Sequence, residues 1–351
     1  MARDGYYIAY AIGTDLTAWL NAKAALVLAE INAIDWFYSA NVTHTKPKTI
    51  NINPMTAGMY PKRVQTGREL GRITSTHYLQ TGILTYATMG ACATVGAGDP
   101  YTHTITKGTT ETPINIAFHL EKEGTTDSRR KDVLGVVPRS LDISVSEKNP
   151  IAFQTYNANF AYTGAGSDLA QPTAHTQANL PPYTWFNYKN TSGASEFTYN
   201  TGAIDVDIVS LDMHIGWSDV LFGAYDGTGY PSNGVVVPPF DSYVTLGVRI
   251  TDAAGTALDA ISDLRAVVSG EGAAEYAGDI DFIADFYRGA NDYLKFTWSD
   301  MYIDPTSYQE VFQAEGNWFD GIIFTLRFKD ETSTLGVVEK NNLDKTYYEN
   351  D

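Results

Sequence analysis

The chain has 351 residues and carries 24 Lys and Arg against 41 Asp and Glu, which gives a formal net charge of −17. Hydrophobic residues make up 44% of it and aromatic residues 13%, enough for a sizeable core, so the composition excludes a disordered chain. The acidity also argues against a protein that grips nucleic acid, because phosphate binding needs clusters of Lys and Arg.

Membrane insertion and disulfide formation are not expected. The sequence has no run of about 18 apolar residues, and its first five residues are polar, so we expect neither a spanning helix nor a Sec-type signal. Cys92 is the one cysteine, and it can form neither an intramolecular disulfide nor, alone, a zinc site. Its small apolar neighbours favour a buried, inert thiol.

Residues 1–60 are predicted to form an N-terminal extension. Thr14 is placed to cap a helix over residues 14–31, in which apolar side chains recur every three and four residues. A Pro- and Thr-containing stretch over residues 41–61 follows and is expected to be loop and strand. The main β domain is predicted over residues 61–351.

A second helix and a β-hairpin are predicted next. The spacing of Tyr78, Leu79 and Ile83 predicts a helix over residues 76–90, which Gly90 would end. From residue 114 apolar and polar residues alternate, which is typical of a strand. A charged connector over residues 121–132 separates this strand from further strand pattern at 133–137 and 141–146. The order predicts a β-hairpin with a long, solvated loop.

The second half of the chain is predicted to be mostly strand. Residues 163–200 are rich in Gly, Pro, Thr and Asn and are expected to be a long loop or insertion. The predicted strands after it cover residues 204–215, 243–250, 278–287, 293–303 and 321–329, with a short helix at 257–268. The predicted fold class is therefore mainly β, a β-sandwich or barrel with flanking α-helices.

No motif in the sequence makes a case for catalysis or for a bound metal. The six histidines form no His-Glu-x-x-His pattern, and no Gly-x-Ser-x-Gly elbow occurs. Two acidic clusters lack the glycine and terminal Glu of an EF-hand loop, and a solvated strand face is the simpler interpretation. The clusters are Asp205, Asp207 and Asp212, and Asp279, Asp281 and Asp285. We therefore expect no catalytic residues, no cofactor and no metal.

The order of several short motifs carries a resemblance to a known family. A small helix over residues 84–90 ends in glycine and is followed by Pro100-Tyr101-Thr102-His103-Thr104, an alternating strand over 114–120, the charged connector and Ser140-Leu141-Asp142-Ile143-Ser144. This order resembles the tail tube proteins (major tail proteins) of long-tailed phages and of archaeal tailed viruses. The resemblance covers about residues 60–345 and is firmest over 84–146.

The resemblance implies a structural virion protein of a siphovirus-like tail, assembled in the host cytoplasm. Family members form rings, usually hexameric, that stack into a tube, and their hairpins join an inner β-barrel between subunits. Here the hairpins would be residues 112–122 with 132–146, and 278–287 with 293–303. Double-stranded DNA would pass through the lumen during ejection without specific binding, and other tail proteins would meet the tube ends. Acids facing the lumen would repel its phosphates, and the candidates are Glu121, Asp279, Asp281 and Asp285.

Two other functions stay open at this point. One is another self-assembling extracellular filament or adhesin subunit, against which the missing signal counts, because such subunits must be exported. The other is a β-sandwich enzyme acting on carbohydrates. Its sugar-binding aromatics would be Trp185, Trp217, Trp298 and Trp318, although such residues more often belong to a core.

Overall fold

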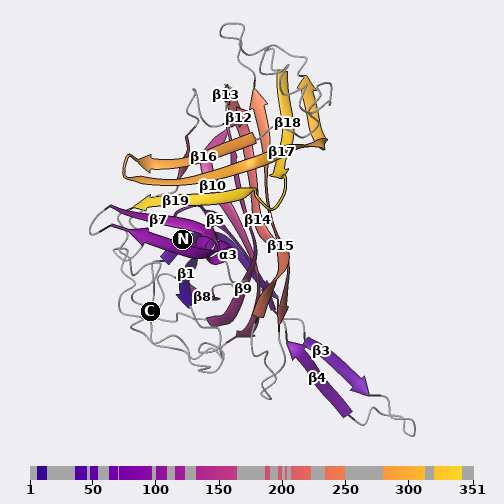
Figure 1. Cartoon of the computed structure of the whole chain (residues 1–351). Coiled ribbons are helices and arrows are strands. Elements are labelled where there is room, and N and C mark those ends of the chain that lie inside the picture. Colours follow the sequence, from indigo (N-terminus) through magenta and orange to yellow (C-terminus); the bar gives the residue numbers. More distant parts are fainter. Residues whose placement is uncertain are drawn as a thin grey trace.

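A computed structural model describes residues 6–13, 36–45, 48–53, 63–69, 71–96, 100–108, 115–122, 132–163, 186–189, 197–199, 202–203, 207–222, 234–249, 280–312 and 320–341. Nearly all of these residues lie in antiparallel strands, so the predicted mainly-β class is confirmed. Two layers of strands cross one another (Figure 1).

The first layer is a sheet of long strands, each hydrogen-bonded to the next. Their order is β2 (Trp36–Thr45), β5 (Gly71–Tyr78), β10 (Asn149–Thr163), β9 (Asp132–Ser146), β14 (Asp207–Phe222), β15 (Gly234–Arg249) and β18 (Asp320–Phe328). Side chains alternate between a buried face and an outer face along each of β5, β10, β9 and β14, as the pleat requires.

The second layer crosses the buried face of the first (Figure 1). Its strands pair in the order β16 (Ile280–Gly289), β17 (Asp292–Phe312), β19 (Thr334–Asn341), β7 (Tyr101–Lys107) and β6 (Gly90–Val95). Large aromatic side chains fill the space between the layers, among them Phe296, whose ring centroid lies 5.7 Å from that of Trp298. The core is therefore that of a sandwich.

The strand β17 belongs to both layers. Its residues 293–299 pair with β19, and from Met301 onward it pairs with β18 of the first layer. Between the two stretches, Asp300 has a φ of 62°, in the left-handed region that Asp tolerates better than most residues. The change of direction at Asp300 thus carries one strand from the second layer into the first.

One helix occurs among the described residues, α3 (Ile83–Met89), and all its side chains are buried. It contacts β7, β9 and β14. Gly90 ends it in the left-handed conformation, with φ 96°, as predicted. The predicted start at residue 76 is wrong, because the alternating burial of β5 continues to Tyr78. The predicted helices over 14–31 and 257–268 lie outside the described residues, so flanking helices stay a prediction.

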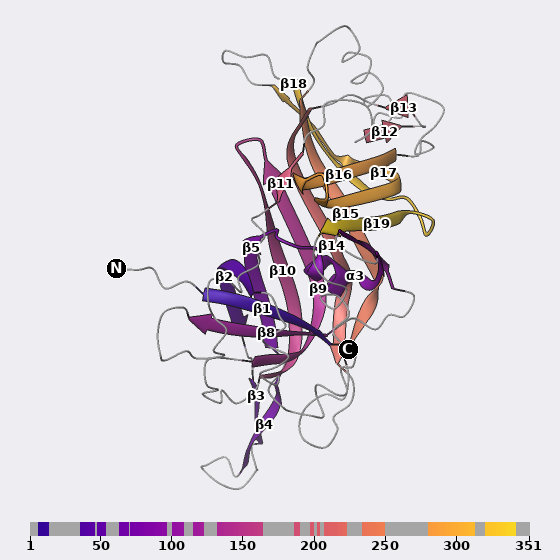
Figure 2. The same ribbon diagram turned by 90° about the vertical axis from the view of Figure 1, so that its left-hand side faces the viewer.

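The N-terminal segment contributes strands to the same network. The strand β1 (Tyr6–Gly13) pairs with β2 and with β8 (Asn115–Lys122), and β8 pairs with β9. Together with the pairs of β5 with β2 and β10, and of β10 with β9, these contacts close a circuit of strands (Figure 2). The boundary predicted at residue 60 therefore lies between two paired strands, β2 and β5.

A two-stranded ribbon stands apart from this body. The strands β3 (Lys48–Asn53) and β4 (Arg63–Glu69) pair with each other and form a sheet of their own. They lie between β2 and β5 in the chain, and both views show them projecting from the body (Figures 1 and 2). The predicted loop-and-strand stretch over residues 41–61 includes β3.

Both predicted hairpins pair within the chain as expected. The strand β8 pairs with β9, and β16 pairs with β17. Part of the predicted insertion at residues 163–200 joins the sheet, because β11 (Asn187–Tyr188) and β12 (Phe197–Tyr199) pair with β16, and β13 (Gly202–Ala203) pairs with β12. Most of that insertion and of the charged connector lies outside the described residues.

Candidate functional site

The outer face of the first layer carries a continuous row of polar side chains. We call this set the polar row. Its members come from β5, β10, β9, β14, β15, β18 and β17, and they are Thr74, Asn157, Ser140, Asp142, His214, Tyr243, Arg327 and Asp304. Neighbouring strands present most of them at paired or nearly paired positions, so each can reach the next.

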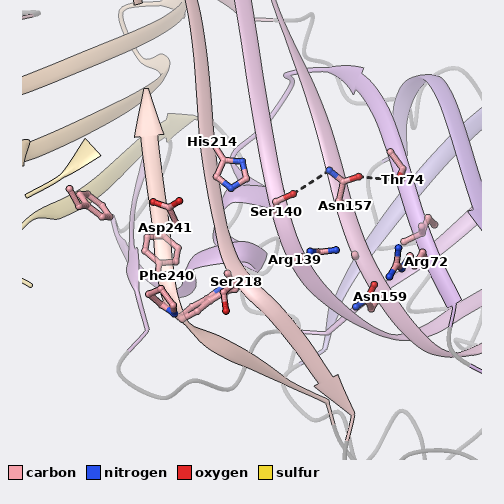
Figure 3. A pocket seen from close by; sticks show the side chains of 15 residues that line it. Arg72, Thr74, Arg139, Ser140, Asn157, Asn159, His214, Ser218, Phe240 and Asp241 are labelled. Carbon is pink, nitrogen blue, oxygen red and sulfur yellow. Dashed lines mark hydrogen bonds between the residues drawn. The ribbon is translucent and has the colours of Figure 1, made fainter. Parts of the chain in front are cut away.

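Hydrogen bonds link the first half of the polar row. The Thr74 hydroxyl donates to Asn157 Oδ1 at 2.9 Å. The Asn157 amide donates to Ser140 Oγ at 3.2 Å (Figure 3). It also lies 3.4 Å from Asp142 Oδ2. Asp142 Oδ1 accepts from His214 Nδ1 at 2.6 Å, since a carboxylate offers only acceptors. The neutral His214 tautomer therefore keeps its proton on Nδ1.

Ring and charge contacts continue the polar row. The His214 and Tyr243 rings are stacked, with centroids 4.7 Å apart. The Arg327 guanidinium lies 4.6 Å from the Tyr243 ring centroid, and its Nε donates to Asp304 Oδ2 at 3.1 Å. Burial and the charge of Asp142 raise the pKa of the Tyr243 hydroxyl. The Thr306 hydroxyl lowers the pKa of Asp304, and Arg327 adds to this.

A pocket of about 610 Å³ opens beside the polar row. Its floor crosses β5, β10, β9, β14 and β15, and one end holds Arg72, Arg139, Asn157 and Asn159 (Figure 3). The other end is lined by aromatic side chains, including Phe240. The arrangement offers cationic and amide donors at one end and an apolar wall at the other.

A buried polar cluster joins Glu339 and Asn341 of β19 to Gly82 and His103. Glu339 is fully buried, and its Oε2 accepts from the backbone N–H of Gly82 at 2.9 Å. Burial raises the pKa of Glu339 to about 7, although Gly82, Asn341 and Arg288 act in the opposite direction. His103 contacts Asn341 Oδ1 at 3.1 Å. The cluster ties β19 to the chain that precedes α3.

The predicted lumen acids are only partly covered by the structure. Asp281 and Asp285 share the half-buried outer side of β16, where they alternate with core residues. Asp281 Oδ1 accepts the Asp300 N–H at 3.1 Å, and burial raises the pKa of Asp285. Glu121 pairs through its backbone with β1, in a different part of the body from β16 (Figure 1). Asp279 lies outside the described residues. Their assignment to a lumen stays a prediction.

Several other residues singled out from the sequence have structural positions. Trp298 donates from Nε1 to Ser242 Oγ and Trp217 to the Thr88 carbonyl, both at 2.9 Å, so these two tryptophans belong to the core. Trp185 and Trp318 lie outside the described residues.

Cys92 is half-buried and packs against the core. His77 is fully buried, and burial lowers its pKa to about 3. Within the described ranges, no three His, Cys, Asp or Glu residues gather around a possible metal position.

The sequence did not point to the polar row or the pocket. Their residues are single Ser, Thr, Asn and Arg side chains spread from residue 72 to residue 328, and no local spacing links them. The alternation of polar residues along β14, with Ser210, Asp212 and His214 outward, was the available signal. It marks a polar outer face but does not say which strands lie side by side.

No helix in the described part of the chain is long and apolar enough to cross a membrane. No protein-family model and no curated protein matches this sequence.

Proposed function

We propose that this chain is a structural virion protein, the subunit of a viral tail tube, and has no enzymatic role. On this proposal copies form rings, hexameric as is usual in the family, that stack into a hollow tube and meet other tail proteins at its ends. Double-stranded DNA would pass through the lumen during ejection. The motif order over residues 84–146, the mainly-β fold and the hairpins β8–β9 and β16–β17 support it.

The ribbon β3–β4 is the observation that carries the proposal. A two-stranded ribbon on its own is marginally stable in water. This ribbon is a separate sheet and projects from the body (Figures 1 and 2). Packing against another copy would supply the missing contacts, and an arm that reaches the next ring would do so at every level of a stack.

The edge strand β6 supports the same proposal. Among the described strands it pairs only with β7, and Val95 at its end is 69% exposed. An open strand edge with an apolar side chain is a hazard for a monomer and an asset for a protein whose neighbours extend the sheet.

A lumen that repels phosphate fits the chain's charge. The formal net charge is −17, and a negative channel would let DNA slide without adhesion. Asp281 and Asp285 on the outer side of β16 would contribute to it. A reconstruction of the assembled tube with a positively charged lumen would contradict this part of the proposal.

Electron microscopy of the purified full chain tests the proposal directly, and we expect rings or tubes. A matched variant replaces residues 46–70 by the two residues Asn-Gly. Thr45 and Arg72 are cross-strand partners, so Asn, Gly and the native Gly71 form a three-residue hairpin loop that can join β2 to β5 without moving either strand. We expect this variant to keep its far-ultraviolet circular dichroism and to form single rings without stacking.

Two outcomes contradict the proposal separately. A wild-type chain that remains monomeric at all concentrations argues against the tube subunit itself. Tubes of normal length from the ribbonless variant leave the tube intact and remove the role of β3–β4.

A further inference from the structure

We propose that the pocket on the outer face of the first layer is a binding site for a phosphate group, held by Arg72 and Arg139. The inference goes beyond the proposed function and does not depend on it. Three observations support it: a β-bulge at Arg139, the lack of a charge partner for either arginine among the described residues, and the size of the pocket.

A β-bulge aims Arg139 into the pocket. The pairing of β9 with β10 passes from Ser140–Asn157 to Pro138–Ala158, so Arg139 is an extra residue opposite no partner. Without the bulge, alternation would send residues 139 and 140 to opposite faces of the sheet. With it, both side chains line the pocket. Bulges that re-aim a side chain are common beside functional sites.

The charges of Arg72 and Arg139 are not neutralised within the described residues, where neither side chain has an ion pair or a hydrogen bond. Arg327, at the other side of the same face, is paired with Asp304 at 3.1 Å, and Arg288 is paired with Asp292 at 2.7 Å. In a chain with 41 acids and 24 basic residues, two uncompensated guanidiniums at one pocket favour an external anion.

The remaining lining suits an oxyanion with an organic substituent. Asn159 is the cross-strand partner of Arg72 and adds an amide donor. At the far end the lining is aromatic, and Lys107 Nζ lies 5.7 Å from the ring centroids of Trp217 and Phe240. The Asp241 carboxylate there lies 3.9 Å from Arg327, which offsets its charge.

Gly216 keeps the floor of the pocket open. It is the cross-strand partner of Ser140, between His214 and Ser218 on the outer face. A Cβ at this position would lie 2.8 Å from the Arg139 carbonyl oxygen and 3.1 Å from His214 Nε2. His214 Nε2 therefore lies beside Gly216, near the Arg139 carbonyl.

The volume, about 610 Å³, exceeds what inorganic phosphate needs and leaves room for a phosphate ester. The same chemistry is offered by a free mononucleotide and by the backbone of a DNA strand. The experiment has to separate these two sources.

Isothermal titration calorimetry on the full chain, at constant ionic strength in chloride, tests the site. The probes are inorganic phosphate, deoxyadenosine 5′-monophosphate and a short DNA duplex. Arg72→Gln and Arg139→Gln each remove one cation, and Lys148→Gln is the matched control, since Lys148 lies in the exposed turn between β9 and β10. We expect saturable phosphate binding, weakened about tenfold or more by each arginine variant and less than about twofold by the control.

Displacement of phosphate by the duplex assigns the site to a DNA backbone, and displacement by the mononucleotide alone assigns it to a small ester; both support the site. Absence of binding for all three probes overturns it. Equal loss in Lys148→Gln and the arginine variants also overturns it, because the binding would then follow net charge alone. Circular dichroism of each variant checks that the fold is retained.

Discussion

Glu339 is a carboxyl group that folding removes from water. It lies near the end of β19, fully buried, and burial raises its pKa from the ordinary 4.5 to about 7. The N–H of Gly82 and the charge of Arg288 stabilise the carboxylate but do not offset its burial. Between about pH 4.5 and about pH 7, Glu339 therefore stays protonated in the folded chain while it is ionised in the unfolded chain.

This difference predicts a pH dependence of stability. Below about pH 4.5 both states are protonated, and the stabilisation is fully present. As the pH rises through about 7 it is lost, by an amount on the order of 3 kcal/mol. We expect Glu339→Gln to remove this decline, as measured by urea unfolding from about pH 4 to about pH 8.

His77 changes the stability with pH in the opposite direction to Glu339. Its pKa is lowered to about 3 by burial, so its stabilisation is fully present above about pH 6.5 and is lost as the pH falls toward 3. The pH ranges over which Glu339 and His77 affect stability overlap, but the wild type and Glu339→Gln both contain His77. The difference between wild type and Glu339→Gln therefore isolates Glu339, and parallel stability curves would contradict its assignment.

At the scale of elements, the strands β5 and β10 make one close contact, between the backbone of Gly71 and the ring of Phe160. Gly71 is the cross-strand partner of Phe160, whose ring covers it. A Cβ at Gly71 would lie 1.9 Å from the ring, so the ring would have to move inside a filled core.

We therefore expect Gly71→Ala to lower the free energy of unfolding by about 1–3 kcal/mol through overpacking. Phe160→Leu alone should also destabilise, because it removes buried aromatic volume. In the double variant the two costs should be less than additive, since the smaller side chain leaves room for the methyl group. Strict additivity in a double-mutant cycle measured by urea unfolding would show that the two residues do not compete for space.

Strands with regular alternation were the ones that the sequence predicted. In β16, Phe282, Ala284 and Phe286 point inward and acids point outward, which is the simplest pattern a strand can have. The strand β10 was missed because it places Gln154 inward and Phe153 outward, where Phe153 packs on Tyr78 at 4.6 Å. On β5, buried polar residues such as His77 likewise break the alternation of apolar and polar residues, so the sequence does not predict that strand.

At the scale of the whole molecule, charge is expected to govern assembly. Copies that each carry −17 repel one another, and salt screens that repulsion over a Debye length of about 10 Å at 0.1 M. We expect the fraction of protein in rings or tubes to rise between about 0.05 M and about 0.5 M sodium chloride. Sedimentation and electron microscopy measure it, and assembly that decreases with salt would show that attraction between opposite charges dominates the interface.

The candidate site is a property of the assembled sheet, which is why the sequence did not predict it. Arg72 and Arg139 are 67 positions apart in numbering, and β10 brings their strands together. The aim of Arg139 depends on a single-residue bulge, which no hydrophobic period encodes. The resemblance over residues 84–146 spans Arg139 but gives no indication of its direction.

The position of β19 has a consequence for how the chain is made. This strand, the last one described, lies between β17 and β7 and is the link through which β6 and β7 join the second layer. During synthesis β6 and β7 leave the ribosome early, but their partner follows more than 200 residues later. At about 5–20 residues per second, that hairpin waits at least 10 seconds or so for its neighbour. The nascent chain therefore carries an incomplete second layer until β19 has been synthesised.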